Sequence, residues 1–193
     1  MENEKAILPE VQQIADAINA AVKNAGVTVS INPSPAEQHS LLLFPTKARE
    51  CAQWLKAESP WQLDYLSNVS GNDWPEDAIT KQTPKQPVKD AGEEPMHPCL
   101  EAVYHLYSIR QSLGPIIIRM RTENRSDKVE LPSLTPIWRS AELQEREIFD
   151  LYGIHFEGHP DLRRLLMWDE FEDHPMRRDY VEPDDYDYEP TPH

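Results

Sequence analysis

The sequence is poor in cysteine and glycine, and both shortages exclude classes of function. Its two cysteines, Cys51 and Cys99, lie far apart and form no CxxC pair. Two such thiols cannot ligate an iron–sulfur cluster by themselves, and we interpret them as reduced, structural thiols of a cytosolic protein, with a disulfide left open. The six glycines form no GxGxxG or GxxxxGK[ST] pattern, so we expect no NAD, flavin or ATP site on this chain.

Positive charge and long apolar runs are also scarce. The chain has 19 Lys and Arg residues against 34 Asp and Glu, which gives a formal net charge of −15. This balance argues against unaided binding of nucleic acid and against adsorption to an anionic lipid surface. No apolar run approaches the ~18 residues of a membrane span, and the acidic N-terminus lacks a signal-peptide pattern. We therefore expect any membrane association to occur through partners.

Hydrophobic periodicity and turn residues predict the first elements. Apolar residues at helical spacing predict a helix from Pro9 to Ala25, which Gly26 ends. Alternation from Val27 to Ile31 predicts a strand, and the apolar run from Ser40 to Phe44 predicts a buried strand next to it. A second helix is expected from a Thr46 N-cap to about Glu58.

The strongest strand patterns come later in the chain. A strand-like piece runs from Trp61 to about Gly71, and two clear strands are predicted at Ala102 to Ile109 and Ile116 to Arg121, with a Gly114-Pro115 turn between them. Both faces of the Ala102 strand are apolar or aromatic, which indicates a central position. Residues Leu131 to Trp138 are interpreted as a connection.

These elements predict an α+β fold, in which a two-layer domain packs helices on a mixed β-sheet and is followed by an extended C-terminal arm. We assign residues 1–158 to the domain and residues 159–193 to a partner-docking arm. Within the domain, residues 75–98 contain five prolines and almost no large apolar residue. We interpret them as an exposed loop, favouring a plain insertion over a partner-binding arm.

A charged helix is predicted from Ala141 to Tyr152, bracketed by Ser140 as N-cap and Gly153 as a left-handed C′ residue. Its apolar residues gather on one side. The other side carries a ladder with i,i+4 spacing, which by itself is typical of a solvated face and consists of Glu142, Arg146 and Asp150.

Glu145 contradicts a simple amphipathic helix, because it projects into the apolar sector, and Glu147 flanks the edge of that sector. A buried carboxylate is costly unless it is paired or hydrogen-bonded. We predict that at least one downstream arginine folds back onto Glu145 or Glu147; the alternative is that these side chains meet a partner protein. The candidates, whose planar guanidinium groups suit carboxylates, are Arg163, Arg164, Arg177 and Arg178.

Three histidines close to the helix raise the question of a metal site. His155 and His159 are four residues apart, but Gly153, Gly158 and Pro160 oppose the helix that would align them. We interpret a histidine before proline as a loop residue whose ring bonds a backbone carbonyl or a carboxylate. The residues that invite a metal-site interpretation are His155, His159, His174, Asp161, Asp169 and Asp173. A metal-dependent hydrolase that uses His155, His159 and the nearby acids remains the alternative. No GxSxG elbow or Cys–His pair indicates a nucleophile.

The C-terminal end is acidic and aromatic. After Arg178 there is no Lys or Arg, and the acids Asp179, Glu182, Asp184, Asp185, Asp187 and Glu189 alternate with three tyrosines and three prolines. Such a segment cannot build its own core. Two interpretations stay open, a solvated terminus and an arm that docks on a neighbouring protein.

Four segments in this region resemble the C-type subunit of NADH-quinone oxidoreductase, which is the thirty-kilodalton subunit family of respiratory complex I. They are Glu145 to Glu147, Asp150 to Ile154, Phe156 to Arg164 and His174 to Tyr180. One departure is Asp173, where the family usually has Gly before the second His-Pro. Homologous subunits of membrane-bound [NiFe]-hydrogenase and other quinone- or ferredoxin-linked complexes are the alternative within this resemblance.

The resemblance implies a comparable two-layer fold and a non-catalytic subunit in the peripheral arm, on the cytoplasmic side of the inner membrane. It implies contact with the D-type, forty-nine-kilodalton subunit, near the iron–sulfur subunits, with residues 160–190 extended along the D-type protein. FMN, iron–sulfur clusters and quinone would belong to partner subunits. The residues expected to be interfacial or structural are Glu145, Arg146, Glu147, Asp150, Gly153, Gly158, His159, Pro160, Asp161, Arg163, Arg164, His174, Pro175, Arg177, Arg178, Asp179 and Tyr180.

Overall fold

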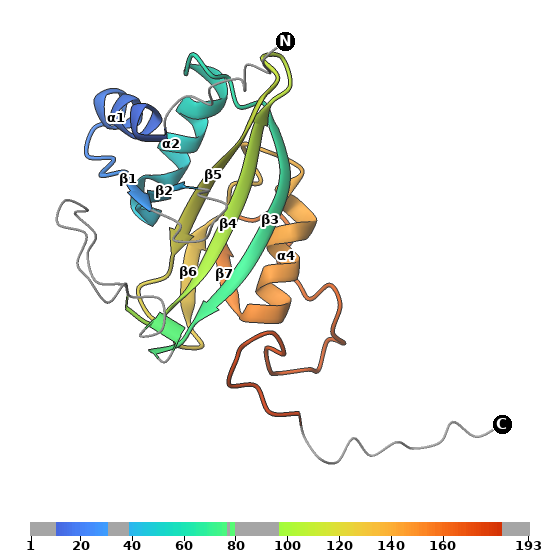
Figure 1. The fold of residues 1–193 in the computed structure, drawn as a ribbon. Helices are drawn as coiled ribbons and strands as arrows, with labels where there is room; N and C mark the ends of the chain where they lie inside the picture. Colours follow the sequence, from blue (N-terminus) through green and yellow to red (C-terminus); the bar gives the residue numbers. More distant parts are fainter. Residues whose placement is uncertain (1–10, 31–38, 77, 80–96, 183–193) are drawn as a thin grey trace, which may run out of the picture.

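The computed structural model describes residues 11–30, 39–76, 78–79 and 97–182 (Figure 1). Most of the predicted loop at 75–98 and the acids after Glu182 therefore lie outside the described residues. No helix within the described ranges is long and apolar enough to cross a bilayer. In chain order the elements are α1 (Val11–Ala21), β1 (Thr28–Ser30), β2 (Ser40–Leu43), α2 (Pro45–Ala57), β3 (Tyr65–Trp74), β4 (Cys99–Ser108), β5 (Leu113–Arg121), β6 (Val129–Pro132), α4 (Ala141–Tyr152) and β7 (Ile154–Glu157).

A mixed five-stranded sheet forms the centre of the fold, with strand order β1-β2-β5-β4-β3. β2 and β5 are parallel, and the other neighbours are antiparallel. β1 lies next to β2 and β4 is an internal strand, as the sequence predicted. Helices α1 and α2 pack on one side of the sheet, whereas α4 lies beside β3 (Figure 1). The α+β prediction is confirmed.

The core lies between this sheet and the helices. Ile14 and Ile18 of α1, Leu55 of α2, and Leu41 and Ile118 of the sheet are fully buried. Burial of each such side chain contributes about 1.5–3 kcal/mol relative to its exposure to water. The apolar residues whose helical spacing predicted α1 therefore form the face that packs in the core.

The first two helices are shorter or begin differently than predicted. The predicted helix to Ala25 ends at Ala21, and Asn19 then bonds both backbone groups of Val27 at 2.8 and 2.9 Å. The second helix has Phe44 rather than Thr46 at its N-cap, with Pro45 in the first turn. Proline can begin a helix without a side-chain cap because its φ is already helical and its missing N–H would have no partner there.

Two strand boundaries were also predicted wrongly. The strand-like piece at Trp61 starts only at Tyr65, because Gln62 has a φ of +43° and the N–H of Leu63 bonds the carbonyl of Leu55. The β4–β5 turn occupies residues 109–112, so Gly114 lies inside β5 rather than in the turn.

A second, two-stranded sheet was missed. β6 and β7 pair in parallel, with Leu131 opposite Phe156. The sequence interpretation placed a connection at Leu131 and assigned no strand to the residues after Gly153. Both strands have four residues, and their partners are distant in sequence, so no hairpin signal marks them.

Helix α4 has the predicted bounds and the predicted C-terminal stop. Gly153 adopts φ +78°, and its N–H bonds the carbonyl of Phe149. Ser140 occupies the N-cap position but makes no capping bond, because its backbone is in the α region and its hydroxyl donates to the carbonyl of Leu66 at 2.9 Å. This bond ties α4 to the edge strand β3.

Candidate functional site

The predicted site residues lie on α4 and on the segment that follows β7. We call residues 159–182 the C-terminal segment; they contain no helix or strand and run beneath α4 (Figure 1). In this chain the segment is hydrogen-bonded to its own domain. The predicted extended path along a partner concerns the assembled complex, and its end at 183–193 lies outside the described residues.

Glu145 is fully buried, as predicted, but its partners are not arginines. Its carboxylate accepts bonds from the Tyr104 hydroxyl at 3.0 Å, the Leu134 N–H at 2.8 Å, and the hydroxyls of Ser133 and Thr135 at 2.5 and 2.9 Å. Glu147 is exposed. Neither acid pairs with an arginine among the described residues, so the prediction of an arginine folding back onto Glu145 or Glu147 was wrong. Glu145 faces the sheet, out of reach of the returning chain.

Arg163 and Arg164 instead meet the opposite side of α4, on which Arg146 and Asp150 are buried rather than solvated. Arg146 is 6% exposed and donates to the carbonyls of Arg163 and Arg164 at 3.1 and 3.0 Å. Asp150 is fully buried, and its Oδ1 accepts from Arg164 Nη1 at 2.7 Å. Burial raises the pKa of Asp150, but the N–H groups of residues 165–167 and Arg164 outweigh it and lower the pKa below its usual value.

His159 and His174, each of which precedes a proline, bond backbone carbonyls, as predicted. His159 Nε2 lies 2.9 Å from the carbonyl of Glu142, and its Nδ1 accepts the N–H of Asp161. His174 Nδ1 lies 3.0 Å from the carbonyl of Asp150. These rings therefore attach the C-terminal segment to both ends of α4.

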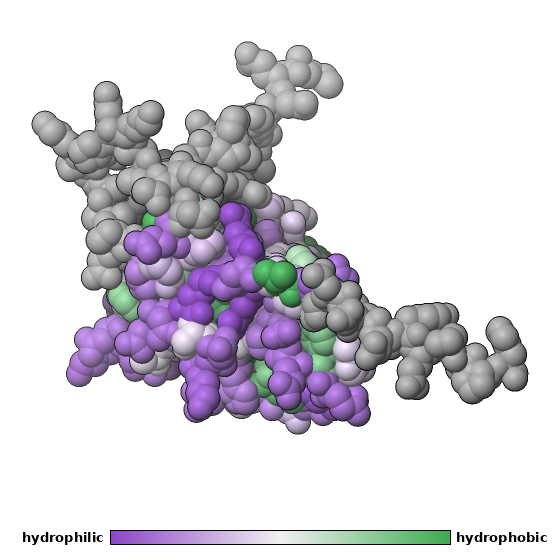
Figure 2. Space-filling model, turned by 90° about the horizontal axis from the view of Figure 1, so that it is seen from below, coloured by the Kyte–Doolittle hydropathy of each residue, from purple (hydrophilic) through white to green (hydrophobic). Residues whose placement is uncertain are grey.

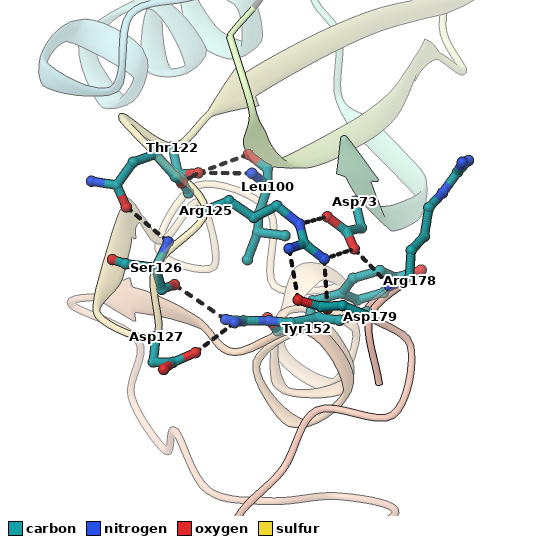
Figure 3. Close-up of polar contacts among 11 residues, drawn as sticks. Asp73, Leu100, Thr122, Arg125, Ser126, Asp127, Tyr152, Arg178 and Asp179 are labelled. Carbon is teal, nitrogen blue, oxygen red and sulfur yellow. Dashed lines mark hydrogen bonds and ion pairs between the residues drawn. The ribbon is translucent and has the colours of Figure 1, made fainter. Parts of the chain in front are cut away.

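A cluster of ion pairs holds the end of the segment against β3 and the β5–β6 connection (Figure 3). Arg125 donates through Nε and Nη2 to Asp73, and through Nη1 and Nη2 to Asp179 at 2.8 and 2.6 Å. The N–H of Arg178 bonds Asp73 at 2.7 Å, while its guanidinium points away. We call Asp73, Arg125, Arg178 and Asp179 the Arg125 cluster. Its two carboxylates raise the pKa of Arg125, so the guanidinium charge is permanent.

Arg177 fixes the same part of the segment from the other side. Its Nε donates to the carbonyl of Tyr152 at 2.8 Å, its Nη1 to Asp127 at 2.7 Å and its Nη2 to the carbonyl of Ser126 at 3.3 Å (Figure 3). Its side chain is 9% exposed. Residues 177–179 are thus bound to three separate elements.

The remaining predicted residues have local roles. Gly158 has φ +74°, and the end of the Arg49 side chain lies where its Cβ would be. Asp161 pairs with Arg163 at 3.0 Å, and the Tyr180 ring lies 6.4 Å from that of Phe171. Pro160 is exposed and Pro175 half-buried.

The outer surface of the C-terminal segment carries large apolar side chains. Leu166 is 61% exposed, Trp168 51% and Met176 52%, whereas Phe171, whose ring lies 4.7 Å from that of Trp168, is buried. The face seen from below is mostly hydrophilic with apolar areas among the charged ones (Figure 2). Exposed tryptophan and methionine on a well-anchored segment are typical of a protein-binding surface.

The described residues offer little for catalysis. No three His, Cys, Asp or Glu side chains within the described ranges are grouped to hold a metal ion. Cys51 and Cys99 are free and buried, and burial raises the pKa of each thiol to about 11, which makes them poor nucleophiles. Two hollows of about 560 and 240 Å³ lie around α2, and none of the predicted site residues lines either.

Sequence interpretation missed the residues that receive the segment. Asp73, Arg125 and Asp127 come from β3 and the β5–β6 connection, about 50 or more positions from their partners. Tyr104 and Ser133 were not recognised as partners of Glu145. No local pattern announces such contacts; only the buried position of Glu145 indicated that donors had to exist.

Comparison with known sequences gives a consistent result. A family model described as the 30 Kd subunit of respiratory-chain NADH dehydrogenase matches residues 42–186. The C-type subunit (C 2) of NADH-quinone oxidoreductase from Rhizobium etli is 39% identical over 137 residues, covering 70% of this chain and 60% of the relative. The C-type subunit from Coxiella burnetii is 35% identical over 185 residues, covering 90% and 79%. A C/D-type subunit from Phocaeicola vulgatus is 38% identical over 130 residues, covering 67% of this chain and 21% of the relative.

Two solved structures share the fold. Nqo5, as a trypsin-resistant fragment of residues 1–134, has a TM-score of 0.51 and 24% identity, covering 79% of this chain and 98% of the fragment. A chain of the membrane-bound sulfane sulfur reductase, an archaeal respiratory membrane complex, has a TM-score of 0.61 and 19% identity, covering 90% and 86%. At these identities the likeness concerns the fold alone.

Proposed function

The chain belongs to the family of the 30 kDa subunit of respiratory-chain NADH dehydrogenase, and from this membership we propose that it is a non-catalytic subunit of a proton-translocating NADH-quinone oxidoreductase. In this role it supports assembly of the peripheral arm while other subunits pass electrons from NADH to quinone. The observation that carries the proposal is the match to the C-type protein of Coxiella burnetii over 90% of this chain.

The chemistry of the C-terminal segment supports an assembly role. The charged side chains that hold its course are largely buried and hydrogen-bonded, namely Arg146 and Asp150 of α4 and Arg177 of the segment itself. Its apolar side chains Leu166 and Trp168 point outward instead. A segment with a polar interior and an apolar exterior is suited to a partner surface.

The D-type subunit is the partner we propose. The relative from Phocaeicola vulgatus carries the name C/D, and this chain matches 21% of its length. A single chain that carries both units keeps them together at a high effective concentration, which suits units that work in contact. In separate chains the same contact has to be supplied by surface complementarity. For this we propose that residues 160–190 lie along the D-type protein while the 164–176 part keeps its attachment to α4.

Further partners and the cellular position follow from the same proposal. We place the chain near the iron–sulfur subunits, with FMN, the clusters and quinone held by partner subunits rather than by this chain. The complex is membrane-associated, and we place this subunit peripherally, on the cytoplasmic side of the inner membrane. Membrane attachment would be indirect.

The test is affinity purification of the full-length tagged chain from its native host, with mass spectrometry of its companions and NADH:quinone activity of the eluate. We expect the D-type and iron–sulfur subunits, together with activity that the chain alone lacks. A Glu130→Gln variant, which changes one exposed charge on β6, should recover the same companions. Recovery of [NiFe]-hydrogenase subunits, or of no companions, would refute the proposal.

A further inference from the structure

Asp150 binds the C-terminal segment through its carboxylate in an unusual way. Its Oδ2 accepts three successive backbone N–H groups, those of Leu165, Leu166 and Met167, at 2.9, 2.6 and 2.9 Å. Successive N–H groups that converge on one point form an anion-binding nest. Here the bound anion is a side chain of α4, so the shape of the turn at 165–167 depends on this one carboxylate.

The same residue closes the loop that starts at this turn. The backbone carbonyl of Asp150 accepts from His174 Nδ1 at 3.0 Å, and the carbonyl of Leu151 accepts from the N–H of Met176 at 3.1 Å. Arg164 spans the loop, donating to Asp150 and to the carbonyl of Asp173. The two ends of the loop formed by residues 164–176 therefore contact adjacent residues of α4, Asp150 and Leu151.

Apolar packing inside the loop is too small to hold it alone. Phe171 is its one buried large apolar side chain, with the Trp168 ring 4.7 Å away and the Arg164 guanidinium 5.4 Å from its centroid. Burial of a single aromatic ring cannot offset the conformational entropy of about thirteen ordered residues, at roughly 1–2 kcal/mol each. The polar anchors at Asp150 therefore determine the shape of the loop.

The ordered loop exposes both large apolar side chains and acids. Leu166, Trp168 and Met176 are each more than half exposed. The exposed acids beside them are Asp169, Glu170, Glu172 and Asp173. A complementary surface has an apolar centre and Lys or Arg residues around it.

We propose that Asp150 is a positioning residue that shapes this loop into a docking surface, and that the occupant is an apolar patch with a basic rim on the D-type subunit. The inference rests on the proposed function, which supplies the partner. It adds the place of contact, at Leu166 and Trp168, and identifies Asp150 as the residue that holds this place in its shape. Because the surface is ordered before binding, the entropy of ordering the loop is not lost at association.

The first experiment separates order of the loop from its contact. Asp150→Asn should remove the charge that holds the three N–H groups, so trypsin should cleave the full-length chain after Arg163 or Arg164 about tenfold faster. Leu166→Ser with Trp168→Ser leaves the polar anchors at Asp150 in place and removes only the contact of the Trp168 ring with Phe171, so it should raise the cleavage rate much less than Asp150→Asn does. Glu130→Gln, with the same change of charge as Asp150→Asn, should behave as wild type.

The second experiment measures binding of the purified D-type protein to the full-length variants. Both Asp150→Asn and the Leu166/Trp168 double variant should bind about tenfold more weakly or worse, whereas Glu130→Gln binds normally. If Asp150→Asn does not fold, the double variant still decides, because its side chains are exposed. Unchanged binding of the double variant refutes the docking surface while wild-type binding upholds the proposed function. Failure of the wild-type chain to bind the D-type protein refutes both.

Discussion

The hydroxyl of Tyr104, in β4, donates a 3.0 Å hydrogen bond to the carboxylate of Glu145, in α4, and neither side chain is exposed to solvent. Burial and the neighbouring carboxylate raise the pKa of Tyr104 well above its usual value, so the hydroxyl keeps its proton. Two more hydroxyls and one N–H complete the coordination of Glu145. A buried acid is thus accommodated by neutral donors alone.

Removal of this carboxylate should destabilise the domain strongly. Glu145→Ala leaves four buried donors without an acceptor, and we expect a loss of about 3–5 kcal/mol in the free energy of unfolding. Tyr104→Phe removes one donor and should cost about 1 kcal/mol. Urea denaturation measures both, with Glu147→Ala, exposed on the same helix, as the control. Wild-type stability of Glu145→Ala would contradict this assignment.

The two carboxylates of the Arg125 cluster should contribute unequally. The Asp73 side chain is 2% exposed and also accepts the Arg178 N–H, whereas the Asp179 side chain is 62% exposed. Asp73→Asn should therefore destabilise the attachment of the C-terminal segment more than Asp179→Asn. A double-mutant cycle between Arg125 and Asp179 should give less than about 1 kcal/mol, decreasing at about 1 M salt. Equal effects of both substitutions would contradict the difference in burial.

Gly153 should be more sensitive to substitution than Gly158, although both have a left-handed backbone. Alanine at either position costs roughly 1–2 kcal/mol from φ alone. At Gly153 the new Cβ would also clash with His174 Nε2 and lie 2.8 Å from Arg177 Nη2, whereas at Gly158 it meets only the flexible Arg49. We expect Gly153→Ala, and not Gly158→Ala, to increase proteolysis of the C-terminal segment. Equal rates of proteolysis of the C-terminal segment in the two variants would refute this.

Acidification should loosen the segment at His174. Burial lowers the pKa of His174 below 6.5, and Arg177 and Arg164 act in the same direction, against the Asp150 carbonyl and Asp127. The unfolded state then binds a proton that the folded state does not. The contribution of neutral His174 to the free energy of unfolding is therefore complete above pH 6.5 and is lost as the pH falls through the lower folded pKa. NMR titration of His174 checks the pKa.

A matched variant tests whether this proton controls the stability. His174→Asn keeps a donor for the Asp150 carbonyl but has no titrating ring, so it should reduce the change in unfolding free energy between about pH 7 and 5. A remainder is expected from His105, because burial lowers the pKa of that ring as well. If the variant retains the wild-type pH dependence, another group is responsible.

Features that depend on neighbouring residues could be predicted from the sequence, whereas contacts between distant parts of the chain could not. The bounds of α4 follow from helical spacing and from Gly153, both of which are local. The parallel pair β6–β7 and the bonds from Arg125 to Asp179 join positions 25 to 54 residues apart, which no short pattern encodes.

The error at Glu145 has a similar physical origin. Helical spacing correctly indicated a buried carboxylate, but it could not indicate which groups from β4 and the chain before α4 would reach it. The expectation that arginines fold back onto α4 applies to Asp150 instead. Asp150 lies near the C-terminal end of the helix, where the returning chain passes, whereas Glu145 faces the sheet.

Helix α4 has one more effect on the molecule, through the outer edge of β3. Ser140 and Gln144 bond backbone groups of Leu66 and Val69, and the Tyr152 ring lies where a Cβ on Gly71 would be. An open edge of this length would be a template for pairing with another copy and for aggregation. Because α4 occupies this edge, a newly synthesised copy that has not yet bound its partner subunits is protected at β3 from strand pairing with other copies of the chain.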